Sequence, residues 1–327
     1  MDKTKPVCVI GAGFMGTVIA TIYARHGYAV RLHDSAAEAL ASYAERATPI
    51  AASLADAAHP VADILGRVTP VADLAAAVDG VCLAHEVVQE HLAVKQALFE
   101  RLDRLCPPDV VLGTNTSSFR LTHLCERVTH RQRVIGIHYI TPAHIIRAVE
   151  LIVADFTTPQ TLAWAQEFLA SIDHVGVVCR ESPGFLVNRI QLALLAEIHR
   201  IVEEGLATPE DIDAAIRLSL GPRWALWGAL LCEDLVVNKR TALAVFDYMR
   251  EQTGVDYYAS TPTLQGMIAR GEQGASTGKG WYAWDAPYGD VVRERDRQLK
   301  AALDWLQTQD PVARIGVRGQ GTPRPGA

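Results

Sequence analysis

Three glycines near the amino terminus constrain the fold of this 327-residue chain more than any other feature. Gly11, Gly13 and Gly16 form a Gly-x-Gly-x-x-Gly turn that follows the apolar run Val7–Ile10 and opens the helical segment Phe14–His26. In this context the first glycine permits a tight turn, the second lets the backbone approach a pyrophosphate, and the third lets helix and strand pack closely. The helix N-terminus adds unpaired amides and a partial positive charge. The turn therefore predicts a dinucleotide-binding α/β fold.

Short β-branched runs alternate with longer alanine- and leucine-rich segments through the first half of the chain. This alternation predicts βαβ units and a parallel, doubly wound sheet. Runs that are apolar throughout fit a sheet that helices cover on both faces. The expected strands are Val7–Ile10, Ala29–Leu32, Val81–Ala84, Val110–Gly113, Val134–Ile137, Leu151–Val153 and Val175–Val178, and the expected helices among them are Phe14–His26, Ala36–Ala47 and Leu92–Leu105.

Helical patterns replace strand patterns after the turn-forming residues Ser182-Pro183-Gly184. Thr208 and Pro209 mark a helix start, with a hydroxyl cap, a proline at the first position and acids in the first turn. Further helices are expected at Phe185–Glu204, Thr241–Thr253 and Thr263–Arg270. We therefore expect a Rossmann-type α/β domain over residues 1–182, an all-α domain over residues 183–309, and a loose tail rich in Gly, Pro and Arg over residues 310–327.

Composition excludes several classes of function. The formal net charge of −6 leaves no broad basic surface, so we expect no nucleic-acid partner. No apolar stretch approaches the roughly 20 residues that span a bilayer, and a strand that starts near Lys5 leaves no room for a cleavable leader. Six scattered cysteines without a C-x-x-C pair predict reduced thiols and a cytoplasmic location. Cys82 and His85 lack a second pair at metal-ligand spacing, so no metal site is expected.

Asp34 ends the second expected strand, where an acid bears on the choice of dinucleotide. Its carboxylate would accept hydrogen bonds from the ribose hydroxyls and repel a 2′-phosphate. Ser35, and no arginine or lysine, follows it. NAD is therefore favoured over NADP, although an acid at a strand end also serves as a helix cap.

A histidine and a glutamate, His138 and Glu150, flank the segment after the fifth expected strand. A histidine that leaves the carboxyl edge of a parallel sheet lies where such folds bind ligands. Imidazole suits proton transfer because its pKa lies near working pH. A carboxylate on the other ring nitrogen would fix the tautomer and stabilise the imidazolium. The spacing of 12 residues is a weak signal when taken alone.

The motifs together, in this order, resemble the L-3-hydroxyacyl-CoA dehydrogenase family, including relatives that act on free hydroxy acids, such as L-gulonate and L-carnitine dehydrogenases. The resemblance runs from about Lys5 to Gly205 and reappears near Gly274. The motifs that carry it are Asn115-Thr116-Ser117-Ser118, the block from His138 to Glu150, Pro183-Gly184-Phe185-Leu186-Val187-Asn188-Arg189, Glu90 with Lys95, and Gly278-Lys279-Gly280-Trp281-Tyr282.

The resemblance implies an NAD-dependent dehydrogenase in which His138 removes a hydroxyl proton while a hydride passes to NAD, and Glu150 orients His138. It implies that Ser117 and Asn188 bond the reacting oxygen and nearby nicotinamide groups; without it, a loop cap and a helix-start amide explain these two residues. It also implies a homodimer through the helical domain, with apolar helices such as Leu192–Ile201 as the interface. The expected cofactor-binding residues are Gly11, Gly13, Phe14, Met15, Gly16, Asp34, Glu90, Lys95 and Asn115.

Two departures from the family bear on the substrate. Thr141 stands where the family has asparagine, and a hydroxyl offers fewer hydrogen-bonding groups than a carboxamide. Ala36–Pro60 holds Arg46 as its only lysine or arginine, where acyl-CoA enzymes carry lysines. Recognition of CoA therefore lacks its obvious phosphate partners.

A third departure is the stretch Gly221–Gly228, which resembles the carnitine and gulonate enzymes more than the acyl-CoA enzymes. Arg223 is a candidate partner for a substrate carboxylate, and Trp224 or Trp227 is a candidate for the pocket wall. Core tryptophans and a surface arginine explain the same residues equally well. We expect Glu233 and Asp234, which follow this stretch, to form a solvated turn.

The sequence thus predicts an NAD-dependent enzyme that interconverts an L-3-hydroxy acid, free or thioester-linked, with its 3-oxo form. One alternative is a fatty-acid-type 3-hydroxyacyl-CoA dehydrogenase. Another is a non-catalytic, crystallin-like NAD(H)-binding protein, against which the intact Ser117, His138, Glu150 and Asn188 argue. The motifs leave open the exact substrate, whether it is attached to CoA or a carrier, and the physiological direction of the reaction.

Overall fold

The computed structural model describes residues 1–309, and the expected tail over residues 310–327 lies outside this described part. The chain divides into two compact units after Leu195. The first unit holds the sheet, and the second is helical. The division falls inside helix α9 (Val187–Glu203), because the amides at the start of that helix bond to Glu150 in the sheet.

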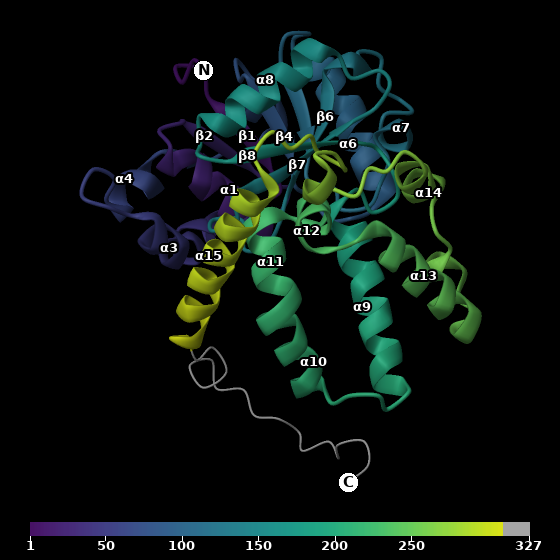
Figure 1. Ribbon diagram of the computed structural model, residues 1–327. Helices are drawn as coiled ribbons and strands as arrows, with labels where there is room; N and C mark the ends of the chain where they lie inside the picture. Colours follow the sequence, from purple (N-terminus) through teal and green to yellow (C-terminus); the bar gives the residue numbers. More distant parts are fainter. Residues whose placement is uncertain (310–327) are drawn as a thin grey trace. The chain divides into compact units, whose positions relative to one another are not determined.

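An eight-stranded sheet with the order β3-β2-β1-β4-β5-β6-β7-β8 forms the centre of the first unit (Figure 1). The first six strands run parallel, β7 is antiparallel to β6, and β8 is parallel to β7. The order 3-2-1-4-5-6 is that of a doubly wound, dinucleotide-binding sheet, so the predicted fold class is confirmed. The strands are β1 (Val7–Ile10), β2 (Val30–His33), β3 (Val68–Pro70), β4 (Leu83–Glu86), β5 (Val111–Thr114), β6 (Val134–Tyr139), β7 (Ala148–Val153) and β8 (Val175–Arg180).

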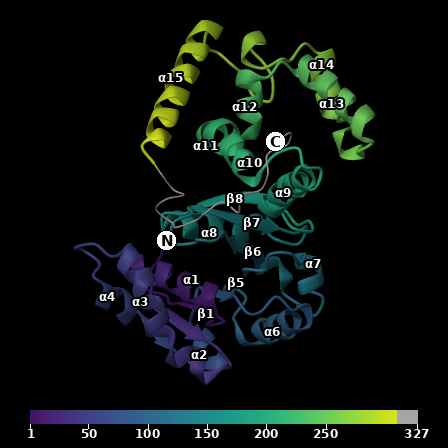
Figure 2. The ribbon, with the colours of Figure 1, turned by 90° about the horizontal axis from the view of Figure 1, so that it is seen from below.

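Helices cover both faces of this sheet, which explains why its strands are apolar throughout. Val7 and Val9 pack with α1, α3 and α8, whereas Cys8 and Ile10 pack with α5, α6 and α7 on the opposite face. Figure 2 shows helices of the two groups on opposite sides of the strands. The helices of this unit are α1 (Phe14–Arg25), α2 (Ala37–Ala41), α3 (Tyr43–Leu54), α4 (Val61–Gly66), α5 (Leu74–Val78), α6 (Leu92–Leu105), α7 (Leu121–Leu124) and α8 (Pro159–Ala170).

The structure differs from the expected elements at several places. The segment expected as one helix over Ala36–Ala47 is two helices that meet at Ser42, whose hydroxyl donates to the carbonyl of Glu38 and competes with the helical pattern. Strand β3 and helix α8 were not predicted. Yet α8 begins with a Thr-Pro pair, and its capping Thr158 accepts the amide of Thr161 in the same manner as the recognised start at Thr208.

The second unit is built from helices. The predicted start at Thr208 is confirmed, since its hydroxyl accepts the amide of Asp211. The 20-residue α15 was not predicted. The helices that follow α9 are α10 (Pro209–Ala215), α11 (Gly221–Trp227), α12 (Ala229–Val236), α13 (Lys239–Thr253), α14 (Pro262–Ala269) and α15 (Tyr288–Gln307). None of the helices in residues 1–309 combines the length and the apolarity needed to cross a lipid bilayer.

The expectation of a solvated turn at Glu233 and Asp234 is wrong, because both residues lie in helix α12, and the difference is largest at Asp234. This residue lies in α12 with a fully buried side chain, and its Oδ1 is 2.6 Å from the buried ammonium of Lys239. Its carboxylate also accepts the amides of Trp281 and Tyr282 at 3.1 and 3.0 Å. An isolated charge would not remain in this position, but a paired and hydrogen-bonded one does.

Candidate active site

A cleft of about 660 Å³ lies at the carboxyl ends of β1 and β2, beside the glycine turn. A Cβ atom added to Gly11 would lie 2.6 Å from the carbonyl oxygen of Val87, and one added to Gly16 would lie 1.7 Å from the carbonyl oxygen of Gly11. At Gly13, which lines the cleft, an added Cβ meets nothing within 4 Å. Gly11 and Gly16 are therefore required by packing, whereas Gly13 leaves a bare backbone surface open for close approach. These residues fit a dinucleotide pyrophosphate.

Asp34 lies at the rim of the same cleft, next to Ser35. Its Oδ2 accepts the amide of Ala12 at 2.7 Å, and its Oδ1 accepts the amide of Ala36 at 2.8 Å. The carboxylate therefore holds the glycine turn and the start of the next segment together. It bonds these two backbone amides, and it also lines the cleft.

The two remaining residues of the turn differ in their surroundings. Phe14 is 67% exposed at the first position of α1. The thioether of Met15 accepts a contact from the Thr141 hydroxyl at 3.5 Å. Thr141 belongs to the loop between β6 and β7, so the glycine turn and the loop that follows His138 are neighbours.

Residues of α6 that the sequence analysis missed form another wall of the cleft. Val94, Leu98 and Arg101 all line it. They recur at positions i, i+4 and i+7, which places them on one helical face. This periodicity was visible in the sequence, but nothing local showed that this face borders the cleft.

His138 and Glu150 face each other across two antiparallel strands. His138 lies within β6, and not beyond its end as expected, and Glu150 is its direct partner in β7. Both side chains are buried, and Nδ1 of His138 is 2.7 Å from Oε2 of Glu150. Because a carboxylate accepts, Nδ1 carries the proton and Nε2 is the ring atom free to accept one.

The Glu150 carboxylate is held on its other oxygen as well. Oε1 accepts the amides of Leu186 and Val187, at 2.9 and 2.8 Å, at the start of α9. Burial alone would raise the pKa of Glu150, but the hydrogen bonds from His138 and from these two amides outweigh it and hold the pKa below its ordinary value. Glu150 is therefore the charged, fixed end of the pair.

Ser117 and Asn188 complete this group. The Ser117 hydroxyl is 3.1 Å from Nε2 of His138, and the Asn188 amide donates to the Ser117 carbonyl at 3.1 Å. The ring of Phe185 lies edge-on to His138, with 5.8 Å between centroids. The structure thus brings together all four residues for which a catalytic role was predicted.

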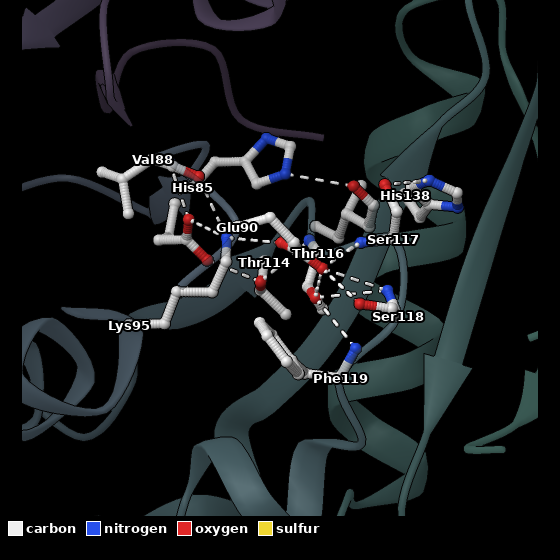
Figure 3. A network of polar contacts seen from close by, with 12 residues as sticks. His85, Val88, Glu90, Lys95, Thr114, Thr116, Ser117, Ser118, Phe119 and His138 are labelled. Atoms are coloured by element: carbon white, nitrogen blue, oxygen red, sulfur yellow. Dashed lines mark hydrogen bonds and ion pairs between the residues drawn. The ribbon is translucent and has the colours of Figure 1, made fainter. Parts of the chain in front are cut away.

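The predicted cofactor residues Glu90 and Lys95 lie in the polar network that reaches Ser117 (Figure 3). Glu90 bonds the amide of Ser117 at 3.1 Å, and Lys95 is 3.3 Å from Glu90. Asn115 accepts the amide of Tyr139, the residue after His138, at 2.8 Å. The sequence analysis missed Glu86, which joins this network from the end of β4.

His85, noted in the sequence with Cys82, is fully buried in β4. Its Nδ1 is 2.8 Å from the hydroxyl of Tyr23, and its Nε2 is 3.1 Å from the carbonyl of Ile137. Burial lowers the pKa of His85 to about 3. The ring is thus neutral, and both of its nitrogens bond within the protein.

Arg223 and Trp224 lie on α11 in the second unit. The guanidinium of Arg223 bonds the carbonyl and the hydroxyl of Ser219 one helical turn earlier. Trp224 is 37% exposed. Their contact with a substrate stays a prediction.

A glycine turn on a doubly wound sheet, with a carboxylate-bound histidine in the neighbouring strands, defines the class of NAD-dependent dehydrogenases. Comparison with known proteins narrows this class. The chain belongs to the 3-hydroxyacyl-CoA dehydrogenase family: residues 6–182 match the model of the family's NAD-binding domain, and residues 184–284 match that of its C-terminal domain. It is accordingly an NAD-dependent hydroxyacyl oxidoreductase. Helix α15 lies beyond the matched residues.

Individual relatives agree with this assignment. The 3-hydroxyadipyl-CoA dehydrogenase of Escherichia coli is 33% identical over 301 residues, which are 89% of this chain and 62% of that longer relative. The 5-formyl-3-hydroxy-2-methylpyridine 4-carboxylate 5-dehydrogenase of Mesorhizobium japonicum is 33% identical over 241 residues, 71% of this chain and 75% of the relative. The crystal structure of a 3-hydroxyacyl-CoA dehydrogenase from Archaeoglobus fulgidus matches with a TM-score of 0.79 and 29% identity, over 93% of this chain and 100% of that one.

Proposed function

We propose that this protein interconverts an L-3-hydroxy acid and its 3-oxo form, with His138 as the general base. The observation that carries the proposal is the contact between Nδ1 of His138 and Glu150. It commits one ring nitrogen to a carboxylate and leaves Nε2, the atom facing Ser117, to accept a proton. A buried carboxylate with a lowered pKa also stabilises the imidazolium that forms.

The neighbouring polar groups support the same chemistry. The Ser117 hydroxyl lies 3.1 Å from Nε2 of His138, so a substrate hydroxyl that bonds to Nε2 would lie within reach of Ser117. Ser117 and Asn188 can then donate to that oxygen as its charge develops, which typically lowers a barrier by a few kcal/mol. NAD bound in the cleft would supply the acceptor for the hydride that leaves the carbinol carbon.

For the cofactor, we propose that the residues predicted from the sequence act as one surface. Gly11, Gly13, Phe14, Met15 and Gly16 would border the pyrophosphate, and Asp34 would bond the adenosine ribose. The cleft lined by Gly11, Gly13 and Asp34 supports this assignment. Glu90 and Asn115 would border the nicotinamide end, because Glu90 bonds Ser117, and Lys95 would act there through its ion pair with Glu90.

The substrate we favour is a small or free hydroxy acid. Arg46, the only lysine or arginine of residues 36–60, donates to the Thr17 hydroxyl at 2.7 Å and to the Ala39 carbonyl at 2.6 Å. Its guanidinium is thus occupied within the protein and is a poor partner for a nucleotide phosphate. Arg223 and Trp224 are the proposed substrate contacts of the second unit.

The second candidate is a fatty-acid-type acyl-CoA dehydrogenase. It is supported by the relatives, several of which are named as CoA dehydrogenases. The pyridine-carboxylate dehydrogenase among them favours a substrate without CoA. The crystallin-like alternative has weaker support, since these relatives are named as enzymes.

A substrate panel tests the proposal. We expect NADH consumption with free 3-oxo acids at a higher kcat/KM than with acetoacetyl-CoA. The reverse order would favour the acyl-CoA alternative. Turnover of neither, with tight NADH binding, would favour a binding protein.

Replacement of the base is the second test. We expect His138→Gln to lower kcat by about 10²–10⁴-fold, the usual loss for a general base, with NADH binding retained. His123→Gln, at an exposed histidine of α7, is the matched control and should keep wild-type turnover. Near-wild-type turnover in His138→Gln would show that another group is the base.

We also propose a homodimer and a cytoplasmic location. Helix α9 has no buried residue, and it exposes Ile190 by 58% and Leu192 by 61%. A second copy of the chain is the natural partner for such an apolar face. All six cysteines are free thiols, which fits a reducing compartment.

A further inference from the structure

The Lys95 ammonium is buried and is held by groups of the protein. Its side chain is 1% exposed, and its ammonium contacts Glu86 Oε1 at 2.6 Å, the Val88 carbonyl at 3.1 Å and Glu90 Oε2 at 3.3 Å. The contacts with Glu86 and Val88 are hydrogen bonds, and the contact with Glu90 is an ion pair. Because the ammonium is buried among these groups, an effect of Lys95 on a bound molecule can pass through the groups it holds.

Glu86 is the fixed end of this arrangement. It is the last residue of β4 and is fully buried. Besides Lys95, its carboxylate accepts the amide of Val88 at 2.7 Å and the hydroxyl of Thr114 at 2.6 Å. Thr114 is the partner of Glu86 in the adjacent strand β5, so two strands of the sheet define the position of the carboxylate.

Glu90 transmits this position to the turn after β5. Its Oε2 faces Lys95, and its Oε1 accepts from the Thr116 hydroxyl at 2.6 Å, the amides of Ser117 and Ser118 at 3.1 Å each, and the Ser118 hydroxyl at 2.8 Å. Figure 3 shows the turn gathered around this carboxylate, with His138 beyond Ser117. A charged acceptor makes such bonds about twice as strong as a neutral one.

We propose that Glu86 and Lys95 are positioning residues: they hold Glu90 against the backbone of Ser117 and thereby aim the Ser117 hydroxyl at Nε2 of His138. The inference rests on the proposed function, because the position of the Ser117 hydroxyl affects the reaction only if His138 is the general base. It differs from a direct cofactor contact by Lys95, which the family resemblance implies. If the proposal is correct, loss of Lys95 lowers kcat because the Ser117 hydroxyl is displaced from Nε2 of His138.

A double-mutant cycle between Lys95→Met and Ser117→Ala separates the two accounts. We expect each single variant to lower kcat by about 10²-fold, the usual loss when one donor to a reacting oxygen is removed. The double variant should be no slower than the slower single variant, within about twofold, the scatter of additive free energies. Fluorescence titration should give Lys95→Met an NADH Kd close to that of the wild type.

Two results would overturn the proposal. One is a double variant whose loss in kcat is the product of the two single losses. The other is a Lys95→Met variant with weakened NADH binding and an unchanged kcat at saturation, which would mark a direct cofactor contact. Glu100→Ala is the matched control, because Glu100 lies on the same helix in an exposed ion pair with Arg104; its kinetics should match the wild type.

A spectroscopic measurement does not depend on turnover. The ¹⁵N chemical shift of His138 Nε2 reports its contact with Ser117 in the substrate-free protein. We expect Glu90→Ala to move this shift to the value found in Ser117→Ala. Glu90→Gln, which keeps an acceptor oxygen, should leave it near the wild-type value.

The chemical-shift measurement remains possible if the Lys95→Met variant fails to fold, because it uses variants of Glu90 and Ser117. A wild-type shift in Glu90→Ala, with a displaced shift in Ser117→Ala, would refute the proposal. If the shifts move as expected but no hydroxy acid is turned over, the positioning inference stands and the proposed function fails.

Discussion

The Glu150 carboxylate bonds groups from two separate parts of the first unit. One oxygen accepts His138, and the other accepts the amides that open α9. A histidine without this partner could carry its proton on either nitrogen. The carboxylate therefore selects the tautomer and at the same time ties the strand hairpin to the following helix.

The lowered pKa of Glu150 predicts how stability changes with pH. Its stabilising contribution is fully present above the unfolded-state pKa of about 4.3 and is lost as pH falls through the lower folded-state value. We expect Glu150→Gln to lower the free energy of unfolding by about 1–3 kcal/mol at pH 7, as a lost buried acceptor does. The difference in the free energy of unfolding between wild type and variant, measured by urea denaturation, should become smaller as the pH falls from about 5.5 to about 3.5.

Glu45→Gln is the control for this measurement. Glu45 is an exposed residue of α3 without a hydrogen-bond partner among residues 1–309. Its variant should track the wild type at every pH. A gap for Glu150→Gln that stays constant down to pH 3.5 would contradict the assigned role of its charge.

The β1–turn–α1 element depends on its glycines for different reasons. A Cβ at Gly16 would collide with the backbone of Gly11, whereas a Cβ at Gly13 would enter open space in the cleft. Gly13 also has a φ of −70°, which alanine adopts freely. Within this one turn, Gly16 is therefore required for packing, and Gly13 is available for ligand binding.

Alanine substitutions at these two glycines test this separation. We expect Gly16→Ala to destabilise the protein by about 1–3 kcal/mol or more, because backbone must move. Gly13→Ala should keep the wild-type Tm but raise the NADH Kd by about tenfold, or ~1.4 kcal/mol. Thermal melts and NADH fluorescence titration measure the two effects. Wild-type NADH binding by Gly13→Ala would place the pyrophosphate elsewhere.

The β6–β7 hairpin is the element that creates the chemical site. Only an antiparallel pairing in the observed register places position 138 opposite position 150. A shift of one residue would turn one of the two side chains to the other face of the sheet. The spacing of 12 residues in the sequence therefore becomes informative once the hairpin register is known.

Assembly of the molecule is tested at the apolar face of α9. We expect Leu192→Glu to dissociate the proposed dimer, because a charge would be buried in an apolar interface. Sedimentation velocity measures the result. Glu203→Gln, which also changes the charge by about one unit at an exposed position of the same helix, should leave the assembly intact. A wild-type protein that sediments as a monomer would refute the dimer.

Much of the fold was predictable from local patterns. The glycine turn, the apolar strands and the Thr-Pro helix start at Thr208 depend on neighbours within a few residues, so their signals are complete in the sequence. Short β3 and the interrupted helix at Ser42 were not, because three-residue strands and single back-bonding hydroxyls leave little periodicity.

Residue types and motif order were enough to name His138, Glu150, Ser117 and Asn188 and to indicate NAD. The contacts that make these residues a site, as well as the buried charges of Glu86 and Asp234 and the cleft wall at Arg101, required the packed molecule. The reason is physical: a side chain's type records what chemistry it can perform, but its burial and its partners depend on which distant segments the sheet and helices bring against it.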